Sequence, residues 1–313
     1  MKIHRYSFLS DIPDNIPPGI FTVGLFDGVH SGHALLIQSL LRCSREAGFL
    51  PSVWTFCGLN TKTDSDSLYL SEVNSHFLES SGVGALHIMN FSPEIGELSG
   101  EEFLDNVLIK RLNARGLVLG SNSRLGRGRS MDAREVLNLA QKRDLKALLV
   151  KLVDRDGAIV SSSAIKAAVR SGRLEEASAW LDRPYSLVGT VQRGRGLGTQ
   201  IGFPTANMAL GGLVHPPSGI YSAEVEVDAL SGGQLWMYPH RAIAYIGSRP
   251  TVESHPCPPR LEVHIRDWQG ELEGHWISVR LGPFIRSDRR FNNLEELRVQ
   301  IAKDLHAVDQ NRS

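Results

Sequence analysis

The sequence predicts an α/β domain followed by a small antiparallel β-barrel with a C-terminal helix. From residue 19 to about 160, short apolar runs alternate with longer helical stretches, as in parallel α/β folds. After residue 184, strand-like runs are separated by Gly and Pro turns. The length of 313 residues, with 42% hydrophobic side chains, exceeds the usual size of one domain. We therefore expect two domains, residues 1–183 and 184–313.

The first domain should hold a parallel sheet with helices between its strands. Its clearest helix begins at Ser31, gathers its leucines on one face and meets a stop signal at Gly48. Another begins with a capping box formed by Ser99 and Glu102. The expected strands are Ile20 to Leu25, Ser52 to Phe56, Ala85 to Met89, Gly116 to Leu119 and Lys146 to Leu152.

The second domain should consist mainly of short antiparallel strands. We expect the boundary near Asp182 to Ser186, after a helical stretch over residues 162–181. The amphipathic residues 294–305 predict a helix that closes the chain. The expected strands lie within residues 185–192, 219–227, 241–247, 260–268 and 275–282.

Composition favours a cytoplasmic protein with small-molecule partners. The 34 basic residues balance the 34 acidic ones, so no net field draws the chain to nucleic acid or to a membrane. Three widely spaced cysteines indicate neither a disulfide framework nor a zinc knuckle. The N-terminal residues lack the apolar run of a signal peptide, and no stretch of about 18 apolar residues follows. An oligomer is compatible with the sequence, but no pattern specifies one.

The end of the first strand has the features of a phosphate site. The run GLFDGVHSGH, residues 24–33, leads directly into a helix. Glycines let the backbone approach an anion, the helix start offers unpaired N–H groups, and two histidines three residues apart can face the phosphates. A tight strand–helix turn is the structural alternative. The site residues predicted here are Gly24, Phe26, Asp27, His30, Gly32 and His33.

This run resembles the first signature of the nucleotidyltransferases that make FAD from FMN and ATP. Residues 160–166 are similar to a second motif of that family, and the resemblance implies that hydroxyls and a lysine hold ATP phosphates there. An ordinary serine N-cap is the alternative. The residues concerned are Ser161, Ser162, Ser163 and Lys166, and Asn122 matches the amide of a third family pattern.

The same half departs from the family at two places. Residues 57–60 read Cys-Gly-Leu-Asn where the family has an acidic residue and Pro-His-Pro. Ser123 and Leu125 stand where the family has aromatic residues. The following arginines, 124, 127 and 129, could grip phosphates or RNA, but a solvated basic loop is favoured because no aromatics are interleaved with them.

Residues 189–208, GTVQRGRGLGTQIGFPTANM, resemble the riboflavin kinase signature. Pro204 fixes the backbone, and Thr205 and Asn207 project to the same side of an extended chain, where their oxygens can bind Mg²⁺. A plain turn beside a hairpin tip is the alternative. The resemblance implies that a glycine-rich loop covers ATP, with Gly194, Gly196, Gly198 and Gly202 as its glycines.

The kinase resemblance continues to the end of the chain. IGSRPT at residues 246–251 and the run around Glu262 follow in the family's order, which implies that Glu262 is the general base for the ribityl hydroxyl. His264 shares its strand face, with a structural or a catalytic role. Arg286 and FNNLEEL resemble the loop and helix that cover the flavin. Three positions differ from the family pattern: Thr199, Tyr245 (usually small and polar) and Glu273.

The resemblance spans roughly residues 15–308 and implies a Rossmann-like nucleotidyltransferase domain followed by a riboflavin kinase barrel. We therefore expect a bifunctional enzyme that uses Mg²⁺ and ATP to convert riboflavin to FMN and FMN to FAD. Three alternatives remain open at this point: a riboflavin kinase with a degenerate N-terminal domain, a noncatalytic flavin-binding regulator, and, disfavoured by zero net charge, an RNA-binding protein.

Overall fold

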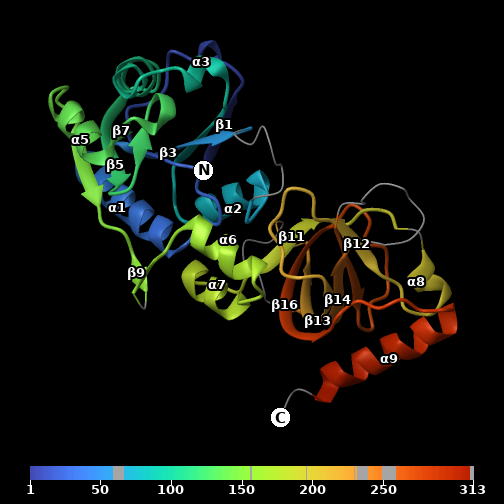
Figure 1. Ribbon diagram of the computed structural model, residues 1–313. Coiled ribbons are helices and arrows are strands. Elements are labelled where there is room, and N and C mark those ends of the chain that lie inside the picture. The colour runs from blue at the N-terminus through green and yellow to red at the C-terminus, as the bar shows by residue number, and fades with distance from the viewer. Residues whose placement is uncertain are drawn as a thin grey trace. The chain divides into compact units, whose positions relative to one another are not determined.

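A computed structural model describes residues 1–58, 67–155, 157–194, 196–228, 230, 239–248 and 259–310 (Figure 1). The chain divides into two compact units. One comprises Met1–Lys62 with Asn74–Ala164, and the other comprises Thr63–Val73 with Ile165–Ser313.

The first unit is built on a parallel six-stranded sheet, as predicted. The strand order is β1-β4-β3-β2-β5-β8. All five expected strands are present, with bounds that differ from the expected ones by one or two residues. The predicted strand Ile20 to Leu25 ends earlier because the chain turns at Phe26, where φ is +50°. The strands are β1 (Lys2–Tyr6), β2 (Gly19–Val23), β3 (Leu50–Cys57), β4 (Ala85–Asn90), β5 (Ala114–Gly120) and β8 (Lys146–Val150).

Strand β1 was not predicted from the sequence. It lies at the edge of the sheet, and three of its five side chains are exposed. Tyr6 alone of its residues is fully buried, and its hydroxyl lies 3.0 Å from Nδ1 of His87 on β4. An edge strand with a single buried position lacks the apolar alternation that marks a strand in sequence.

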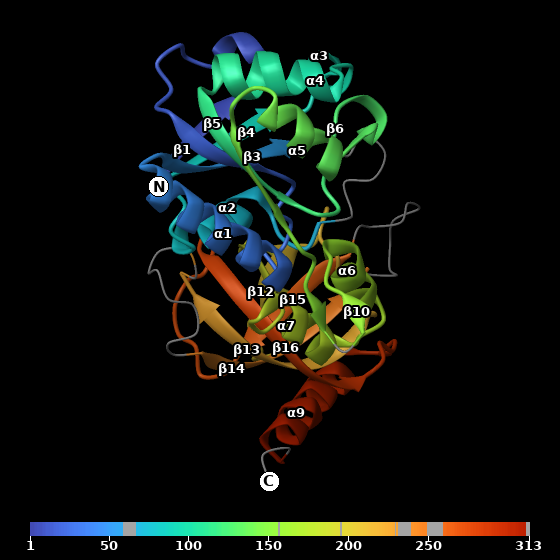
Figure 2. The same ribbon diagram turned by 90° about the vertical axis from the view of Figure 1, so that its left-hand side faces the viewer.

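Helices cover both faces of this sheet, as Figure 2 shows. Successive residues alternate between two cores: Ile20 packs with α1 and α2, and Phe21 packs with α3 and α5. The predicted stop at Gly48 is confirmed by its left-handed backbone, φ +71°. The helices are α1 (Ser31–Ala47), α2 (Ser71–Ser80), α3 (Pro93–Gly96), α4 (Gly100–Glu102) and α5 (Ala133–Gln141).

The Ser99–Glu102 capping box is also confirmed. The Ser99 hydroxyl accepts from the Glu102 amide at 3.1 Å, and the Glu102 carboxylate accepts from the Ser99 amide at 2.8 Å. The segment that follows, η2 (Phe103–Arg111), is a π-helix rather than an ordinary α-helix. Short elements complete the unit: η1 (Leu9–Asp11), β6 (Arg124–Leu125), η3 (Arg127–Arg129), β7 (Met131–Asp132), β9 (Asp154–Arg155) and β10 (Ala158–Ile159).

The second unit contains the predicted antiparallel barrel. Its strand order is β11-β16-β13-β14-β15-β12. A bridge between Gln192, just after β11, and Asn207 of β12 brings the two ends of the sheet together, so the barrel is nearly closed. Strand β12 was not predicted as a strand of the sheet. The strands are β11 (Ser186–Thr190), β12 (Ala206–Ala209), β13 (Gly219–Val227), β14 (His240–Gly247), β15 (Arg260–Ile265) and β16 (Trp276–Arg286).

The helices of this unit are α7 (Leu174–Leu181), α8 (Leu197–Gln200) and α9 (Leu294–Gln310). Helices α2 and α6 (Ser162–Arg170) lie partly in this unit and partly in the first. The predicted C-terminal helix is confirmed as α9 and extends beyond residue 305. It lies along the outside of the barrel, next to β14 (Figure 1).

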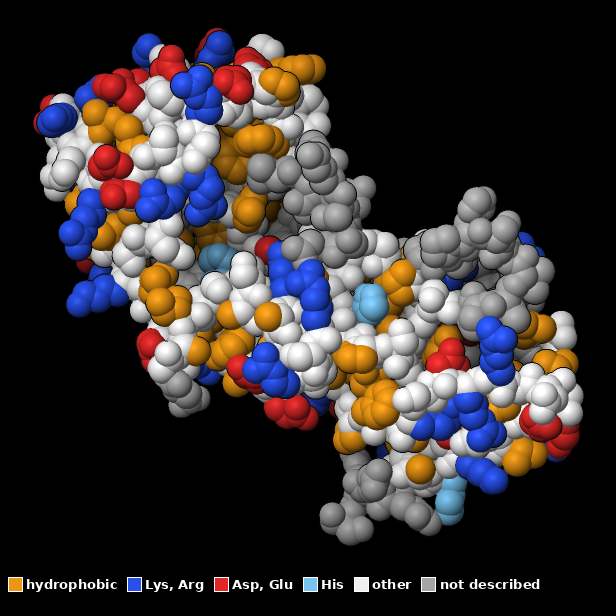
Figure 3. All heavy atoms as spheres, viewed as in Figure 1, with side chains coloured by type: hydrophobic (Ala, Val, Ile, Leu, Met, Phe, Trp, Pro, Cys, Tyr) orange, Lys and Arg blue, Asp and Glu red, His pale blue; other side chains and the backbone are white. Residues whose placement is uncertain are grey.

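None of the helices in the described part of the chain is long and apolar enough to cross a membrane. Cys43 and Cys57 are free thiols, and Cys257 lies outside the described residues. Figure 3 shows acidic, basic and hydrophobic side chains interspersed on the viewed face.

Candidate functional site

The run GLFDGVHSGH forms a tight loop between β2 and α1. The backbone has positive φ at Phe26 (+50°), Gly28 (+88°) and Val29 (+39°). Positive φ is uncommon at residues other than glycine and often marks a functional loop. Gly28 donates its amide to Oδ1 of Asn74 on α2 at 2.9 Å, which anchors the middle of the loop. The loop therefore ends in a fixed position at the N-terminus of α1.

The two histidines lie together at this helix start. His30 is the N-cap of α1, and its Nδ1 accepts from the backbone N–H of His33 at 3.3 Å. Their rings stack with centroids 3.7 Å apart. Gly32 leaves room for this stack, because a Cβ there would stand 3.1 Å from Cε1 of His30. Both imidazoles are thus held at the positive end of a helix dipole, where an anion is favoured.

Phe26, unlike the neighbouring predicted site residues, is part of the hydrophobic core. It is only 1% exposed, belongs to the core beneath α1, and lies 4.9 Å from the His33 ring. Gly24 accommodates it, since a Cβ at residue 24 would stand 3.2 Å from the Phe26 ring. Phe26 therefore supports His33 from below.

The structure joins the serine motif to this loop. Ser162 donates its hydroxyl to the carbonyl of Asp27 at 2.9 Å, although 135 residues separate them in sequence. Ser161 accepts from the amide of Ala164 at 3.2 Å and so caps the start of α6. The starts of α1 and α6 consequently meet at one edge of the sheet, where two sets of helix N–H groups can bind phosphates. Ser163 and Lys166 lie on α6 itself.

Other sequence-predicted features of this half lie around the same edge of the sheet. Asn122 is exposed and follows β5, which pairs with β2. Cys57 donates its thiol to Oδ1 of Asn90 at 3.2 Å, whereas Leu59 and Asn60 of the altered loop lie outside the described residues. Arginines 124, 127 and 129 are exposed, and Arg127 pairs with Glu97 at 3.5 Å.

In the barrel, the pairing of neighbouring strands aligns five residues in one row across the sheet, and three of them are predicted site residues. Asn207 pairs with Glu262, Glu262 with Tyr245, Tyr245 with Ile220, and Ile220 with Arg286. Residues directly opposite each other in paired strands project to the same face of the sheet. The predicted metal ligand, general base and flavin-side arginine therefore share one face of the barrel.

The Asn207 end of this row suits a hard cation. Asn207 is 6% exposed and donates its amide to the Thr205 carbonyl at 3.2 Å. Its Oδ1 is buried and has no hydrogen-bond partner among the described residues. A buried oxygen without a donor is costly, and an oxygen-coordinated ion such as Mg²⁺ would satisfy it. No group of three or more His, Cys, Asp or Glu in the described chain is placed to hold a metal.

The glycine-rich loop packs closely against this segment. A Cβ at Gly194 would stand 2.4 Å from Nδ2 of Asn207, and a Cβ at Gly198 would stand 2.3 Å from the Phe203 carbonyl. Gly196 and Gly202 have φ of +71° and +83°. The loop can approach the Asn207 segment only because these positions lack side chains. Arg195, between the first two glycines, lies outside the described residues.

His264 has a structural contact in this arrangement. Its Nδ1 lies 2.8 Å from the Pro204 carbonyl, and its ring meets Phe203 edge to face at 5.4 Å. It therefore fixes the segment that carries Thr205 and Asn207. Glu262, two residues earlier on β15, is partly exposed.

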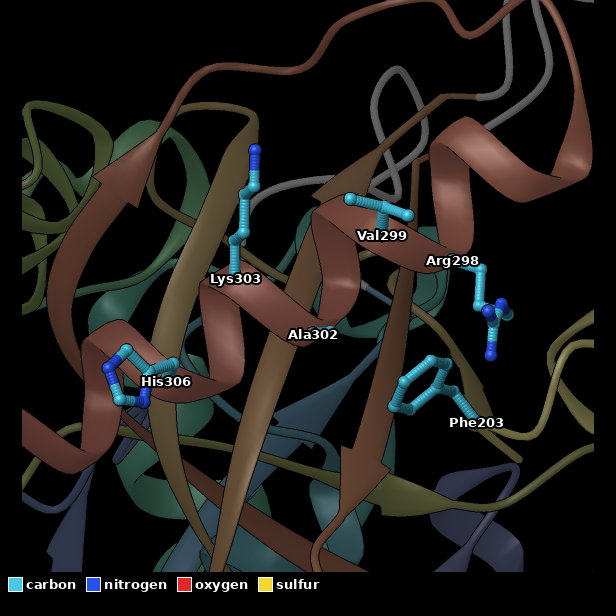
Figure 4. Close-up of a pocket in the computed structure, with 6 residues that line it drawn as sticks. All are labelled: Phe203, Arg298, Val299, Ala302, Lys303 and His306. Carbon is cyan, nitrogen blue, oxygen red and sulfur yellow. The ribbon is translucent and has the colours of Figure 1, made fainter.

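A hollow of about 440 Å³ lies between Phe203 and helix α9, as Figure 4 shows. One side is the aromatic ring of Phe203, and the other is a face of α9 that carries both apolar and basic side chains. Such a mixture suits a flat, largely apolar ligand with polar edges. The helix residues that line it are Arg298, Val299, Ala302, Lys303 and His306.

Arg286 binds α9 directly. Its Nε lies 3.0 Å from Oδ1 of Asp304 and its Nη2 lies 2.7 Å from Oδ2. Asp304 is 3% exposed and also accepts from the Gln300 amide at 2.7 Å. Arg286 thus anchors the closing helix to the end of β16. Residues 249–251 of IGSRPT lie outside the described residues.

Several of these residues carry no sequence motif. Asn74 and Asp304 lie on helices far along the chain from their partners at Gly28 and Arg286, and no local pattern marks them. A polar residue on a helix is most often solvated, so only the folded contact identifies these two as supporting residues.

The two sites define a protein with two nucleotide-handling units, one on a parallel α/β sheet and one on a barrel with a candidate metal site. Comparisons specify them further: residues 13–164 match the family model described as FAD synthetase, and residues 181–311 match that described as riboflavin kinase. The chain belongs to the bifunctional riboflavin kinase/FMN adenylyltransferase family.

Two relatives carry the same description, and one solved structure with a different title has a similar fold. A bifunctional riboflavin kinase/FMN adenylyltransferase of Escherichia coli K12 is 32% identical, over 91% of this chain and 90% of its own length. The protein of the same description from Bacillus subtilis is 31% identical, with the same coverage. A crystal structure of a macrolide-efflux protein from Streptococcus pneumoniae is similar with a TM-score of 0.80 and 25% identity, over 99% of both chains.

Proposed function

We propose that this protein phosphorylates riboflavin to FMN at the barrel and adenylylates FMN to FAD at the sheet edge, with ATP as co-substrate and Mg²⁺ as metal in both reactions. The observation that carries the proposal is the pairing of Glu262 with Asn207, which sets a carboxylate beside an unsatisfied buried oxygen. Relatives described as bifunctional support the two-step activity over a kinase alone or a regulator.

In the kinase step, Glu262 accepts the proton of the terminal ribityl hydroxyl as that oxygen attacks the γ-phosphorus of ATP. The new P–O bond forms as the bond to the β-phosphate oxygen breaks, so ADP leaves. The glycine loop, Gly194 to Gly202, lies over the phosphates, with Pro204 fixing the next segment. Thr205 and Asn207 would hold Mg²⁺, which neutralises phosphate charge when bound. We place the flavin ring in the hollow between Phe203 and α9.

In the adenylyl transfer, a phosphate oxygen of FMN attacks the α-phosphorus of ATP and pyrophosphate leaves. The FMN phosphate is already ionised near neutral pH, so this step needs no general base. His30 and His33 stabilise the charge that develops on the transferred group, together with the N–H groups at the starts of α1 and α6. Gly24, Asp27 and Gly32 form the loop that approaches the phosphates, and Asn122 faces the bound nucleotide. Ser161, Ser162, Ser163 and Lys166 hold the outer phosphates.

The setting of these reactions is part of the proposal. We assign the reactions to residues 184–313 and 1–183, respectively, and expect both to take place in the cytoplasm. The partners are the small molecules ATP, riboflavin and FMN, with no role for nucleic acid.

Two variants of the full chain test the division of labour. With ATP and Mg²⁺ present, Glu262→Gln should lower FMN formation from riboflavin by about 10²- to 10⁴-fold and leave FAD formation from added FMN unchanged. His30→Ala should do the reverse. Glu224→Gln, which removes a barrel carboxylate paired with Arg280 at 3.3 Å, is the matched control and should affect neither reaction. Equal loss of both reactions in either variant would contradict separate sites.

A further inference from the structure

Tyr245 lies beside the proposed general base, Glu262. On β14 it pairs with Glu262 on one side and with Ile220 on the other. Its side chain therefore projects to the same face of the barrel as Glu262. A tyrosine at this position reaches farther than a small side chain and can contact structure beyond the strands.

The direction of the Tyr245 ring is fixed by Gly247. A Cβ at residue 247 would stand 2.2 Å from the Tyr245 hydroxyl and 2.5 Å from Cζ. Residues two apart on a strand share a face, so the ring extends along β14 and occupies the space that glycine leaves. Any larger residue at 247 would displace the ring.

The hydroxyl of Tyr245 reaches the segment between β16 and α9. It donates to Oδ2 of Asp288 at 2.8 Å. We refer to residues 287–293, which join β16 to α9, as the strap. The hydrogen bond joins the strap to the strand next to β15, and a hydrogen bond to a carboxylate is among the stronger kinds.

The strap is also joined to the first turn of α9. Asn293 accepts from the Glu296 backbone amide at 2.8 Å, and the Asn292 backbone amide donates to Oε2 of Glu296 at 3.1 Å. Helix α9 forms one wall of the hollow opposite Phe203. A shift of the strap would therefore move the start of that wall.

We propose that Tyr245 is a positioning residue for riboflavin: by donating to Asp288 it holds the strap, and through the strap α9, in the position that binds the flavin ring. The proposal rests on the kinase function assigned above. Without this hydroxyl, Asp288 is free to pair with arginines of the strap itself, such as Arg289 and Arg290. The start of the wall then loses one of its anchors, while the Arg286–Asp304 pair still holds the later turns of α9. Because its hydroxyl is bonded to Asp288, we assign Tyr245 no part in the proton or phosphoryl transfer, so the chemical step should not depend on it.

Steady-state kinetics of FMN formation by the full chain tests this proposal. Tyr245→Phe and Asp288→Ala should each raise the KM for riboflavin by about 5- to 10-fold, the cost of losing one hydrogen bond to a charged group that water partly replaces. The kcat value and the KM for ATP should stay within about twofold of those of the unaltered chain. The pH dependence of kcat should be unchanged. The double variant should be no worse than either single variant, because both remove the same contact.

Tyr221→Phe is the matched control, since it removes another barrel tyrosine hydroxyl, which donates to the Pro217 carbonyl. It should leave the KM for riboflavin unchanged. Additive effects in the double variant, or an unchanged KM in Tyr245→Phe with a raised KM in Tyr245→Ala, would overturn the proposal in favour of direct action by the ring. Absence of FMN formation by the unaltered chain would instead count against the kinase function itself.

Discussion

Replacement of Arg286 by alanine should mainly lower the free energy of unfolding of the barrel unit, and any loss of FMN formation should follow from that lower stability. Arg286 and Asp304 form a largely buried ion pair, with side chains 20% and 4% exposed and contacts of 2.7 to 3.1 Å. Arg286→Ala leaves the Asp304 carboxylate buried, with the Gln300 side-chain amide still donating to it at 2.7 Å. Loss of one member of a buried pair costs about 3–5 kcal/mol.

The lower end of that range applies here, about 3 kcal/mol, because Gln300 still donates to the carboxylate and the arginine was partly solvated. For a unit of this size each kcal/mol lowers Tm by roughly 2–4 °C, so we expect a fall of about 6–12 °C. Calorimetry of the full chain measures this. Arg289→Ala, which removes only an exposed contact with the Phe291 ring, should lower Tm by no more than about 4 °C.

The same calorimetry distinguishes two roles for Arg286: holding α9 through Asp304, or contacting the ligand directly. If it anchors α9, Asp304→Asn should lower Tm in the same direction, and the loss of riboflavin binding should follow the loss of stability. An Arg286→Ala protein that melts within 1 °C of the unaltered chain but no longer forms FMN would refute the anchoring argument.

Three further predictions concern other parts of the molecule. Burial lowers the pKa of His87 to about 3, from about 6.5 in the unfolded chain, so only the unfolded state gains a proton between those values. Stability should therefore fall as pH falls, by about 1.4 kcal/mol per unit between pH 6 and 4, and His87→Phe should flatten this slope in urea titrations; an unchanged slope would argue against neutral burial. Asn74→Ala removes the acceptor for the Gly28 amide and should lower FAD formation from FMN about 10-fold without changing FMN formation, and equal effects on both would contradict a local role. Gly194→Ala must displace the Asn207 side-chain amide, so it should raise the Mg²⁺ concentration needed for FMN formation. A titration of Mg²⁺ at fixed ATP measures this. An unaltered titration would contradict the assignment of Asn207 as a metal ligand.

The sequence predicted most of both sheets because their strands carry strong local patterns. Strands β3, β4 and β5 are mostly apolar and mostly buried, as is typical of parallel strands inside a sheet. In β13 and β15, buried and less buried residues alternate. Strand β12 has neither pattern: it is four residues long, follows Pro204 closely and exists through its pairing with β15.

The motifs located the candidate sites, but not the contacts that hold them in place. The histidine and serine motifs were predicted separately, and the bond from Ser162 to Asp27 joins them in the folded chain. Contacts such as Tyr245 with Asp288 depend on strand register and on the course of a connecting segment, and neither can be read from local sequence.

The most direct test of the two-step function is incubation of the purified full chain with riboflavin, ATP and Mg²⁺, followed by chromatographic separation of the flavins. We expect FMN to appear first and FAD to follow, because the product of the barrel site is the substrate of the sheet-edge site. FMN without FAD, also when FMN is supplied directly, would contradict the adenylyltransferase assignment, and unchanged riboflavin would contradict the account as a whole.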